Sequence, residues 1–422
     1  MMSKLHHVII GASAAGLAAV EAIRRVDRDC SITVVSKEPM PLYSRVGLTH
    51  FISREVVYDG MRMRDDGYFD QMKVRGLMGV AALSVDHAAR RVALSNGESL
   101  AYDNLLVASG SHAVMPPIPG TNLQGIYPCI TNNDAKQIDA AISSAKEAVV
   151  IGAGLIGIQV VDAFARRGLK TTVIEQMPHV MPAMADAVSA AMAEEVLRKA
   201  GVTVRCGVRA TELLDKSGYI AGVRIKSGEL LPCQLLVMAA GVAPNIDFLD
   251  GTGVTIHRGL LVDAHQQTSL DRIYAAGDVA ETVDMFSGER VVNAIWPEAL
   301  NQGRIAGLNM AGVIASYEGS MAMNVTSVLQ TPVVSLGAWN SQPGDRYEIR
   351  EVRDDRRQAY RKLVFDGEQL VGAMLVGDFE DAGILHNMIR TRTTFTLRPD
   401  HLAPSTIRWG TVLQAIKKAG RV

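Results

Sequence analysis

The 422-residue chain contains few cysteines, and their spacing excludes several kinds of redox and metal site. Only four occur, and no two form a Cys-x-x-Cys pair: Cys30, Cys129, Cys206 and Cys233. A disulfide framework, a zinc site, an iron–sulfur cluster and a thioredoxin-type pair all need closer, regular cysteine spacing. We therefore predict no metal site in this chain, and we expect it in a reducing cytoplasm.

The chain also lacks an excess of charge of either sign. Its 43 Lys and Arg residues nearly balance its 44 Asp and Glu residues, so the net charge is −1. Binding to nucleic acid or to a membrane surface usually depends on clustered positive charge. The balance predicts no nucleic-acid partner, and the 48% hydrophobic and 21% charged content is ordinary for a soluble globular protein.

No apolar run in the sequence reaches the roughly 18 residues expected of a membrane-spanning helix. The stretch from Val8 to Val20 imitates a signal peptide, but Gly11 and Gly16 interrupt it and Glu21 follows it. We therefore predict neither a membrane span nor a signal peptide.

What the chain does contain is two glycine-rich turns about one domain apart, Gly11-Ala-Ser-Ala-Ala-Gly16 and Gly152-Ala-Gly-Leu-Ile-Gly157. Each follows an apolar run and precedes an Ala-rich stretch, which predicts a strand, a turn and a helix. Glycines there allow a tight turn and let backbone N–H groups approach a pyrophosphate at the start of the helix. Two such turns in series predict two bound dinucleotides, and the usual reason to hold two is hydride transfer between them.

The pattern around the turns predicts an α/β protein. Short apolar strands are expected at 31–35, 104–110, 148–151 and 170–174, with a helix at 155–167 that Gly168 ends. Asn96-Gly97 predicts a hairpin after 91–94, and the prolines at 116–119 predict a linker. His6 and His7 are expected on an edge strand. From about residue 320 the pattern changes to strands with a hairpin, which predicts a third domain.

Several motifs, in this order, resemble those of the pyridine-nucleotide-dependent FAD oxidoreductases, in the branch of rubredoxin and ferredoxin reductases and of the flavin portion of nitrite reductase. Besides the two turns, they lie at 108–110, 241–245, 275–278, 363–367 and 371–378. The resemblance covers nearly the whole chain and implies FAD and NAD(H) as cofactors. It implies two Rossmann-like domains, an FAD-binding domain of 1–112 and 245–320 interrupted by an NAD-binding domain of 113–244. A C-terminal α+β interface domain would span 321–422.

The resemblance also implies which residues contact FAD. The family places an acid for the adenosine ribose at the end of the second strand, and here the acid is displaced to Glu38, which could instead be an exposed charge. Arg45 would neutralise the pyrophosphate or remain a solvated arginine. Asp278 would bind the ribityl chain, with a helix following it, although an Asp there could simply cap that helix. The remaining implied FAD contacts are Gly11, Ser13, Ala14, Gly16, Ala82, Ser109, Gly110, Gly277 and Trp296, the last of which could be a core residue.

For the second nucleotide, the key residue is Glu175, 23 positions after Gly152 (175 − 152). A carboxylate there binds a ribose 2′-hydroxyl and repels a 2′-phosphate, so NAD(H) is favoured over NADP(H). The family commonly has a Glu where this chain has Gln159, so no catalytic side chain is assigned. The implied NAD contacts, besides Glu175, are Gly152, Gly154, Leu155, Ile156, Gly157 and Gly241.

The segment Tyr43–His50 matches the loop in which related disulfide reductases and NADH oxidases carry a reactive cysteine, and it contains no thiol. We therefore predict that this chain does not carry out thiol–disulfide chemistry, since that chemistry requires a thiolate nucleophile. His50 could relay a proton or be plain polar surface.

The resemblance thus implies an FAD-dependent NAD(H) oxidoreductase that exchanges electrons with an iron–sulfur partner. The segment 36–45 resembles NADH-binding flavoprotein subunits of anaerobic 2-oxoacid oxidoreductases of the phenylglyoxylate dehydrogenase type. In that setting thiamine-dependent subunits would be partners and this chain would reduce NAD. Two alternatives are a free-standing NADH-dependent rubredoxin or ferredoxin reductase and, in a different class, a flavin or NAD redox sensor.

Overall fold

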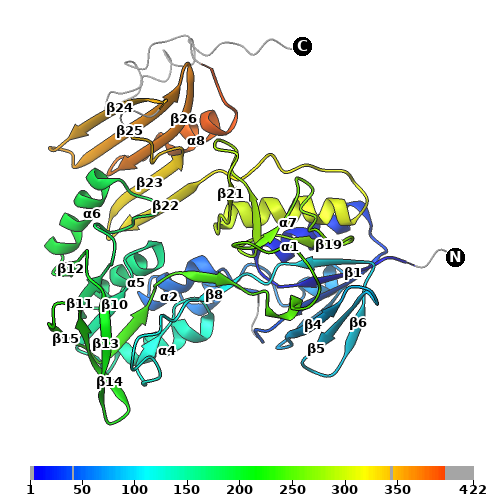
Figure 1. Cartoon of the computed structure of the whole chain (residues 1–422), viewed down its shortest axis with the longest axis horizontal. Coiled ribbons are helices and arrows are strands. Elements are labelled where there is room, and N and C mark those ends of the chain that lie inside the picture. The colour runs from blue at the N-terminus through cyan, green and yellow to red at the C-terminus, as the bar shows by residue number, and fades with distance from the viewer. Residues whose placement is uncertain (1–3, 40–41, 343–345, 395–422) are drawn as a thin grey trace. The chain divides into compact units, whose positions relative to one another are not determined.

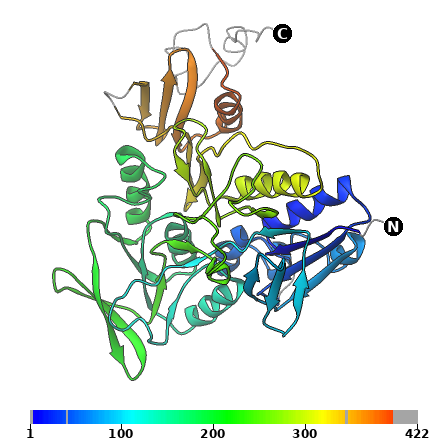
Figure 2. The same ribbon diagram turned by 45° about the vertical axis from the view of Figure 1, so that its right-hand side comes forward.

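A computed structural model describes residues 4–39, 42–342 and 346–394. The chain folds into two compact units, shown from two sides in Figures 1 and 2. The first unit comprises the chain up to residue 47, residues 56–112 and residues 242–320. The second comprises residues 48–55, residues 113–241 and the chain from residue 321. None of the helices in the described ranges is both long and apolar enough to cross a membrane.

The first unit is built on a five-stranded parallel sheet in the order β19-β7-β1-β2-β3. Its strands are mostly buried and apolar, as expected when both faces of a parallel sheet are covered. The helices α1 (Ala14–Val26) and α7 (Trp296–Met310) lie side by side in both views and pack closely. The strands are β1 (His6–Ile10), β2 (Ser31–Ser36), β3 (Val74–Met78), β7 (Asn104–Val107) and β19 (Ile273–Ala275).

Smaller elements complete the first unit. An antiparallel meander of β4 (Ala82–Asp86), β5 (Arg91–Leu94) and β6 (Ser99–Ala101) contains the predicted hairpin, with Gly97 at φ +85°. A second small sheet joins β18 (Leu260–Leu261), β20 (Ala280–Val283) and β21 (Arg290–Val291). Short helical turns are η1 (Arg45–Gly47), η2 (Tyr58–Met61), α3 (Tyr68–Gln71) and η3 (Asp247–Leu249). The strands β8 (Ser111–Ala113) and β17 (Val242–Pro244) pair where the chain leaves and re-enters this unit.

The second unit contains a parallel sheet in the order β12-β11-β10-β16-β9, which repeats the arrangement of the first. In each unit the strand before the glycine turn lies between the strand that follows the helix and a later buried strand. The strands are β9 (Ile126–Tyr127), β10 (Glu147–Ile151), β11 (Lys170–Ile174), β12 (Thr203–Arg205) and β16 (Leu235–Met238). The accompanying elements are α2 (Leu48–Ile52), α4 (Asn132–Ile142), α5 (Leu155–Arg166), α6 (Ala187–Lys199) and the meander β13 (Ala210–Lys216), β14 (Tyr219–Ile225) and β15 (Leu230–Pro232).

The C-terminal part of the second unit is an antiparallel sheet in the order β22-β23-β26-β25-β24, packed by α8 (Ala382–Arg390). A largely buried ion pair joins it to α6, because Lys362 Nζ lies 3.7 Å from the carboxylate of Asp186, the N-cap of that helix. The Tyr360 hydroxyl also donates to Asp186, over 3.0 Å. The strands are β22 (Met323–Val328), β23 (Thr331–Gly337), β24 (Glu348–Asp354), β25 (Ala359–Asp366) and β26 (Gln369–Val376).

Two expectations about the first 52 residues are wrong. His6 and His7 lie on β1, the central strand, and not on an edge. His7 is fully buried, hydrogen-bonds the Asn104 amide over 3.3 Å, and has a pKa lowered to about 4 by that burial. The segment after Gly47 is a short helix, α2, and not a loop, because Leu48 and Ile52 are buried one helical turn apart.

The contact between α1 and α7 depends on two helical glycines. A Cβ at Gly303 would lie 2.1 Å from the Ala15 carbonyl oxygen, and one at Gly307 would lie 2.6 Å from that of Ala19. Both neighbours are backbone atoms, so neither can move aside without shifting a helix. Glycine here therefore sets the distance between the two helices.

We expect Gly303→Ala to lower the thermal unfolding midpoint, at a cost of about 1–3 kcal/mol, the usual range for overpacking a close contact. Gly383→Ala on α8 is the matched control, because no atom lies within 4 Å of its added Cβ. Calorimetry of both variants checks this. Equal midpoints for the two would contradict the proposed packing constraint.

Candidate functional site

The first glycine turn joins β1 to α1, and backbone packing requires its outer two glycines. Gly11 has φ +118°, and a Cβ there would lie 2.0 Å from the Ala108 carbonyl oxygen. A Cβ on Gly16 would lie 1.9 Å from the Gly11 carbonyl oxygen. The turn is held on both sides, since Gly11 N–H donates to Val35 O and Ala108 N–H donates to Ile10 O, each over 2.8 Å.

The second turn, between β10 and α5, repeats this geometry. Gly152 has φ +101°, and its Cβ would lie 2.2 Å from the Ala239 carbonyl oxygen. A Cβ on Gly157 would lie 1.9 Å from the Gly152 carbonyl oxygen, and Gly152 N–H donates to Ile174 O over 2.8 Å. The two turns are therefore equivalent in conformation and in their backbone partners.

The middle position of the second turn is different. Gly154 has an ordinary φ of −70°, and an added Cβ would meet no atom within 4 Å. The fold itself does not require glycine there, so the space above Gly154 suits the close approach of a pyrophosphate. Ser13 and Gly154 are the N-caps of α1 and α5, and neither makes a side-chain cap bond. The first helical turns therefore suit phosphate binding. The dinucleotide contacts of Ala14, Leu155 and Ile156, which lie in these turns, stay predictions.

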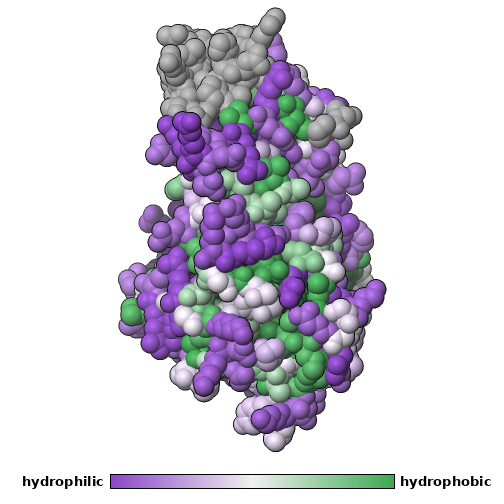
Figure 3. Space-filling view, turned by 90° about the vertical axis from the view of Figure 1, so that its left-hand side faces the viewer, coloured by the Kyte–Doolittle hydropathy of each residue, from purple (hydrophilic) through white to green (hydrophobic). Residues whose placement is uncertain are grey.

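Glu175 lies directly after β11 and is buried against the second turn. Its carboxylate accepts the Ala153 N–H over 2.8 Å and the Met177 N–H over 2.9 Å. A carboxylate has about four acceptor positions, so two backbone donors leave room for ribose hydroxyls. The arrangement thus fits the predicted ribose contact. The Met177 side chain, two positions later, is 46% exposed. Figure 3 shows one face of the molecule, on which apolar patches lie among hydrophilic residues.

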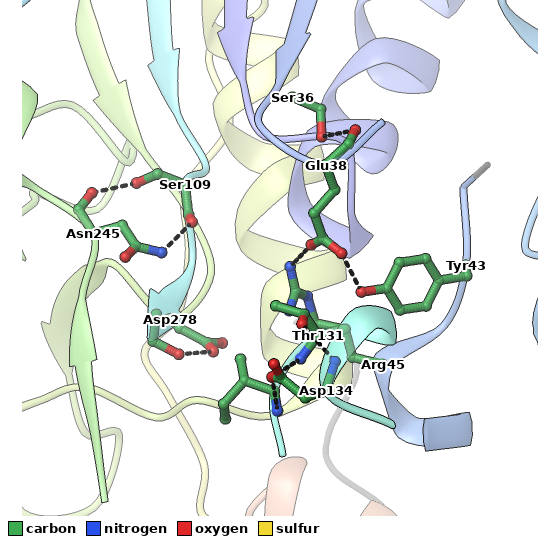
Figure 4. Close-up of polar contacts among 11 residues, drawn as sticks. Ser36, Glu38, Tyr43, Arg45, Ser109, Thr131, Asp134, Asn245 and Asp278 are labelled. Carbon is green, nitrogen blue, oxygen red and sulfur yellow. Dashed lines mark hydrogen bonds and ion pairs between the residues drawn. The ribbon is translucent and has the colours of Figure 1, made fainter. Parts of the chain in front are cut away.

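Asp278 follows β19 in the first unit. The Ser111 hydroxyl donates to its carboxylate over 2.8 Å, a bond drawn in Figure 4. Gly277, at φ +80°, donates its N–H to the buried Gln302 amide oxygen over 2.8 Å. The strand β20 begins at Ala280, so the expectation of a helix directly after Asp278 is wrong and Asp278 caps no helix. Its carboxylate is therefore available for a polar ligand such as a ribityl chain.

Ser109 and Gly110 hydrogen-bond Asn245, a residue of the 241–245 motif that is not among the predicted site residues. The Ser109 hydroxyl donates to Asn245 O over 2.7 Å, and the Asn245 amide donates to Ser109 O over 2.9 Å. Asn245 N–H also donates to Gly110 O over 2.9 Å. The Ser109 hydroxyl thus already hydrogen-bonds the protein. Contact between FAD and the backbone of Ser109 stays a prediction.

The candidates at the end of β2 lie together. Glu38 accepts hydrogen bonds from Tyr43 and from Arg45, and Figure 4 shows the three side chains converging. Ala82 begins β4, and the nearby Val80 N–H donates to Ser36 O over 2.9 Å. The structure therefore gathers Glu38 and Arg45 into one cluster and brings the segment leading to Ala82 against the end of β2.

The two remaining candidates are less defined by contacts. Trp296 begins α7 and packs, partly buried, against the core cluster around α1, which supports its role as a core residue. Gly241 is exposed at φ +110°, and no atom lies within 4 Å of an added Cβ. A contact of either residue with a cofactor stays a prediction.

The cysteines are poorly suited to nucleophilic chemistry. All four are free. Burial raises the pKa of Cys129 and Cys233 to about 12, and burial together with Glu194 raises that of Cys206 to about 12. Since a thiolate is the reactive form, these thiols stay protonated at neutral pH. Within the described ranges no group of three His, Cys, Asp or Glu side chains could hold a metal ion.

Comparison with known proteins places this geometry in a family. The profile described as pyridine nucleotide-disulphide oxidoreductase matches residues 5–303, and that of the rubredoxin NAD+ reductase C-terminal domain matches residues 323–393. The chain belongs to the pyridine nucleotide-disulphide oxidoreductases. This oxidoreductase depends on FAD and NAD(H), as the sequence predicted, and the fold class is confirmed.

Individual relatives of this oxidoreductase cover most of its length. It is 34% identical over 394 residues to the NADH-dependent phenylglyoxylate dehydrogenase subunit epsilon of Aromatoleum evansii, which covers 92% of each chain. It is 31% identical to the rhodocoxin reductase of Rhodococcus erythropolis, covering 92% of this chain and 90% of that one. Among solved structures, an NAD-dependent persulfide reductase from A. fulgidus matches with a TM-score of 0.85 at 29% identity, covering 92% of this chain and 77% of that one.

We expect Gly154→Ala to leave the fold and the flavin content unchanged and to weaken NADH binding, because only the ligand needs the space above Gly154. Gly157→Ala is the comparison, since its Cβ would meet backbone at 1.9 Å and disrupt the fold. Stopped-flow titration with NADH, together with thermal unfolding, measures both effects. Unchanged NADH affinity in Gly154→Ala would place the pyrophosphate elsewhere.

Glu175→Gln should reduce the preference for NADH over NADPH by about tenfold or more. The amide oxygen can still accept the Ala153 N–H, while the charge that repels a 2′-phosphate is lost. The kcat/KM values for the two coenzymes give the ratio. A ratio that stays at the wild-type value would mean that Glu175 only supports the turn.

Alkylation with iodoacetamide at pH 7 should leave NADH-dependent flavin reduction unaffected. Because the raised pKa values lie near 12, the fraction of thiolate is very small below pH 9 and grows only as the pH approaches 12. Mass spectrometry of the treated protein counts the modified cysteines. Rapid modification with parallel loss of activity would show that a thiol takes part in catalysis.

Proposed function

We propose that this oxidoreductase exchanges electrons between NAD(H) and an iron–sulfur partner, as the NAD-reducing flavoprotein subunit of a 2-oxoacid dehydrogenase complex of the phenylglyoxylate type. When bound, FAD supplies hydride exchange with nicotinamide and can pass electrons singly to an iron–sulfur centre. The two glycine turns would hold the two dinucleotides. Asp278, with Ser111 fixing one of its oxygens, would bind the ribityl chain.

The observation that carries the proposal is the missing thiol. The segment Tyr43–His50 contains no cysteine, and Cys30 is the only cysteine of the first unit. Cys30 lies just before β2, at the amino ends of the parallel strands, whereas ligands of such sheets bind at the carboxyl ends. With no thiol to receive them, electrons have to pass to a separate acceptor. The chain offers no cluster ligands within its described residues, so a partner would supply the cluster.

The phenylglyoxylate setting is supported by the relative of Aromatoleum evansii, which matches over 92% of both chains. In that setting the thiamine-dependent subunits would oxidise the 2-oxoacid and their clusters would deliver electrons to this chain. The four free cysteines are consistent with the cytoplasmic location that we also propose.

A second candidate is a free-standing reductase. The match to a rhodocoxin reductase, at 31% identity over 90% of that protein, favours an independent reductase, and the rubredoxin NAD+ reductase C-terminal domain supports a rubredoxin-type acceptor. Both candidates use the same nucleotide sites, so only the partner distinguishes them.

Affinity purification of the native protein from its own cells distinguishes the two, with flavin, iron and thiamine diphosphate measured in the eluate. Stoichiometric co-purification with iron-containing and thiamine-dependent subunits supports the complex. An iron-free flavoprotein that NADH reduces rapidly would contradict the complex and favour the free reductase. Slow reduction by NADH with a long-lived complex would instead favour the redox sensor.

A further inference from the structure

Two charged residues stand next to each other in a buried strand of the C-terminal sheet. Arg361 and Lys362 belong to β25, and their side chains are 5% and 3% exposed. A buried ion pair contributes little net stability, because apolar residues of similar volume often stabilise a protein as well or better. Stability alone therefore does not account for these two residues, and their partners show what they hold.

Each of the two cations pairs with the aspartate that precedes a helix. Successive residues of a strand point to opposite faces of its sheet. The Arg361 guanidinium donates to Asp381, the N-cap of α8, over 2.6 Å. The Lys362 ammonium lies 3.7 Å from the carboxylate of Asp186, the N-cap of α6. The strand β25 thus holds the start of a helix with each of these neighbouring residues.

Asp186 has partners both in its own helix and in the C-terminal sheet. Its carboxylate accepts the Ser189 N–H over 2.9 Å within α6 and the Tyr360 hydroxyl of β25 over 3.0 Å. Burial, and then the Asp186 carboxylate, raise the pKa of Tyr360 well above its ordinary value, so the hydroxyl stays a donor. Lys362 also donates to the Ser341 carbonyl oxygen over 2.8 Å, so its ammonium is fixed from two sides.

The segment that ends at Asp186 also contacts the second glycine turn. This segment, residues 176–186, leads from Glu175 into α6. Met181 within it is fully buried, and its N–H donates to the Ala153 carbonyl oxygen over 2.7 Å. The Ala153 N–H donates to the Glu175 carboxylate over 2.8 Å. Both backbone groups of Ala153, which lies inside the turn, are therefore bonded to Glu175 or to the segment after it.

The short connection from Met181 to Asp186 is itself structured. The N–H groups of Met184 and Ala185 both donate to the Met181 carbonyl oxygen, each over 2.9 Å. The side chains of Met184 and Ala185 are buried as well. A displacement of Asp186 would therefore move Met181, and with it the backbone of Ala153 in the glycine turn.

We propose that Lys362 and Tyr360 of the C-terminal sheet are positioning residues for NAD(H): through Asp186 they hold the segment 176–186 against the second glycine turn and so keep that turn in the conformation that receives the pyrophosphate. This role needs no contact between the C-terminal sheet and the coenzyme. The inference rests on the NAD(H) site at the second turn and is independent of the electron partner.

The experiment measures binding of ADP-ribose to the FAD-loaded protein by calorimetry. ADP-ribose has the pyrophosphate and both riboses of NAD but cannot reduce flavin, so the measurement does not depend on turnover. In Lys362→Met the dissociation constant should rise about threefold or more, the usual size of an effect carried through a packed network. Tyr360→Phe removes only one hydroxyl and should raise the dissociation constant by less.

Stopped-flow reduction by NADH gives a second measurement on the same variants. The NADH concentration that gives half the limiting rate should rise with the dissociation constant of ADP-ribose. The limiting rate of flavin reduction should stay at the wild-type value, because the role concerns binding. A fall in the limiting rate with unchanged ADP-ribose affinity would contradict a positioning role in coenzyme binding.

Arg361→Met is the matched control. It removes an ion pair of similar burial at the next residue of the same strand, and its partner Asp381 begins α8, outside both glycine turns. Its ADP-ribose affinity should equal that of the wild type, even if its thermal unfolding midpoint falls as far as that of Lys362→Met.

A double variant covers the case in which Lys362→Met does not fold. Combining Lys362→Met with Asp186→Asn removes the unpaired carboxylate charge and keeps a residue that caps helices well. This double variant should recover part of the ADP-ribose affinity lost in Lys362→Met, or fold where the single variant does not and bind more weakly than the wild type.

Equal losses of affinity in Arg361→Met and Lys362→Met would overturn the proposal, because the site would then respond to general stability. Wild-type affinity in Tyr360→Phe together with Lys362→Met, or with the double variant, would overturn it as well. Gly154→Ala separates this failure from failure of the NAD(H) site. If Gly154→Ala alone weakens ADP-ribose binding, the site is correct and only the positioning role is wrong; if it has no effect either, the site itself is wrong.

Discussion

The structure depends on how closely a strand-ending glycine approaches the neighbouring strand. Gly11 and Gly152 have no room for a side chain, because an added Cβ would lie 2.0 Å from the Ala108 carbonyl oxygen or 2.2 Å from that of Ala239. That contact fixes the turn, the turn fixes the start of the helix, and the helix start aims its N–H groups at one place. Because both units meet the same constraint, both place the N-terminal end of a helix at the carboxyl edge of a parallel sheet, a position that suits phosphate binding.

Much of this could be predicted from the sequence, because the signals are local. The turns, the strands β2, β10 and β11 and the helix α5 follow from glycine spacing and short apolar runs. Elements whose burial depends on distant residues were not predicted: α7 packs on α1 through Gly303 and Gly307, more than 280 positions away in sequence (303 − 15 = 288). The placement of His7 failed for the same reason, since its burial depends on strands that arrive after residue 100.

The candidate site divides in the same way. The candidate residues at the two turns and Asp278 could be chosen from the sequence, because their chemistry and spacing are visible along the chain. The protein partners of the candidate residues were not predicted, because Ser111 at Asp278, Gln302 at Gly277 and Asn245 at Ser109 reach the site only through the tertiary fold. Polar side chains assigned to a ligand are often already bonded to the protein, as Ser109 is. A ligand therefore binds beside side chains that already hydrogen-bond the protein, and its affinity depends on the acceptor positions that remain.

The bonds of Asn245 have a consequence for how the chain is divided. They join the point where the chain leaves the first unit, at Ser109 and Gly110, to the point where it returns. Hydrogen bonds therefore directly join the segment where the chain leaves the first unit to the segment where it returns. In topological terms residues 113–241 are an insertion into the first unit. Such an insertion could grow, shrink or be exchanged during evolution without opening the sheet that receives it.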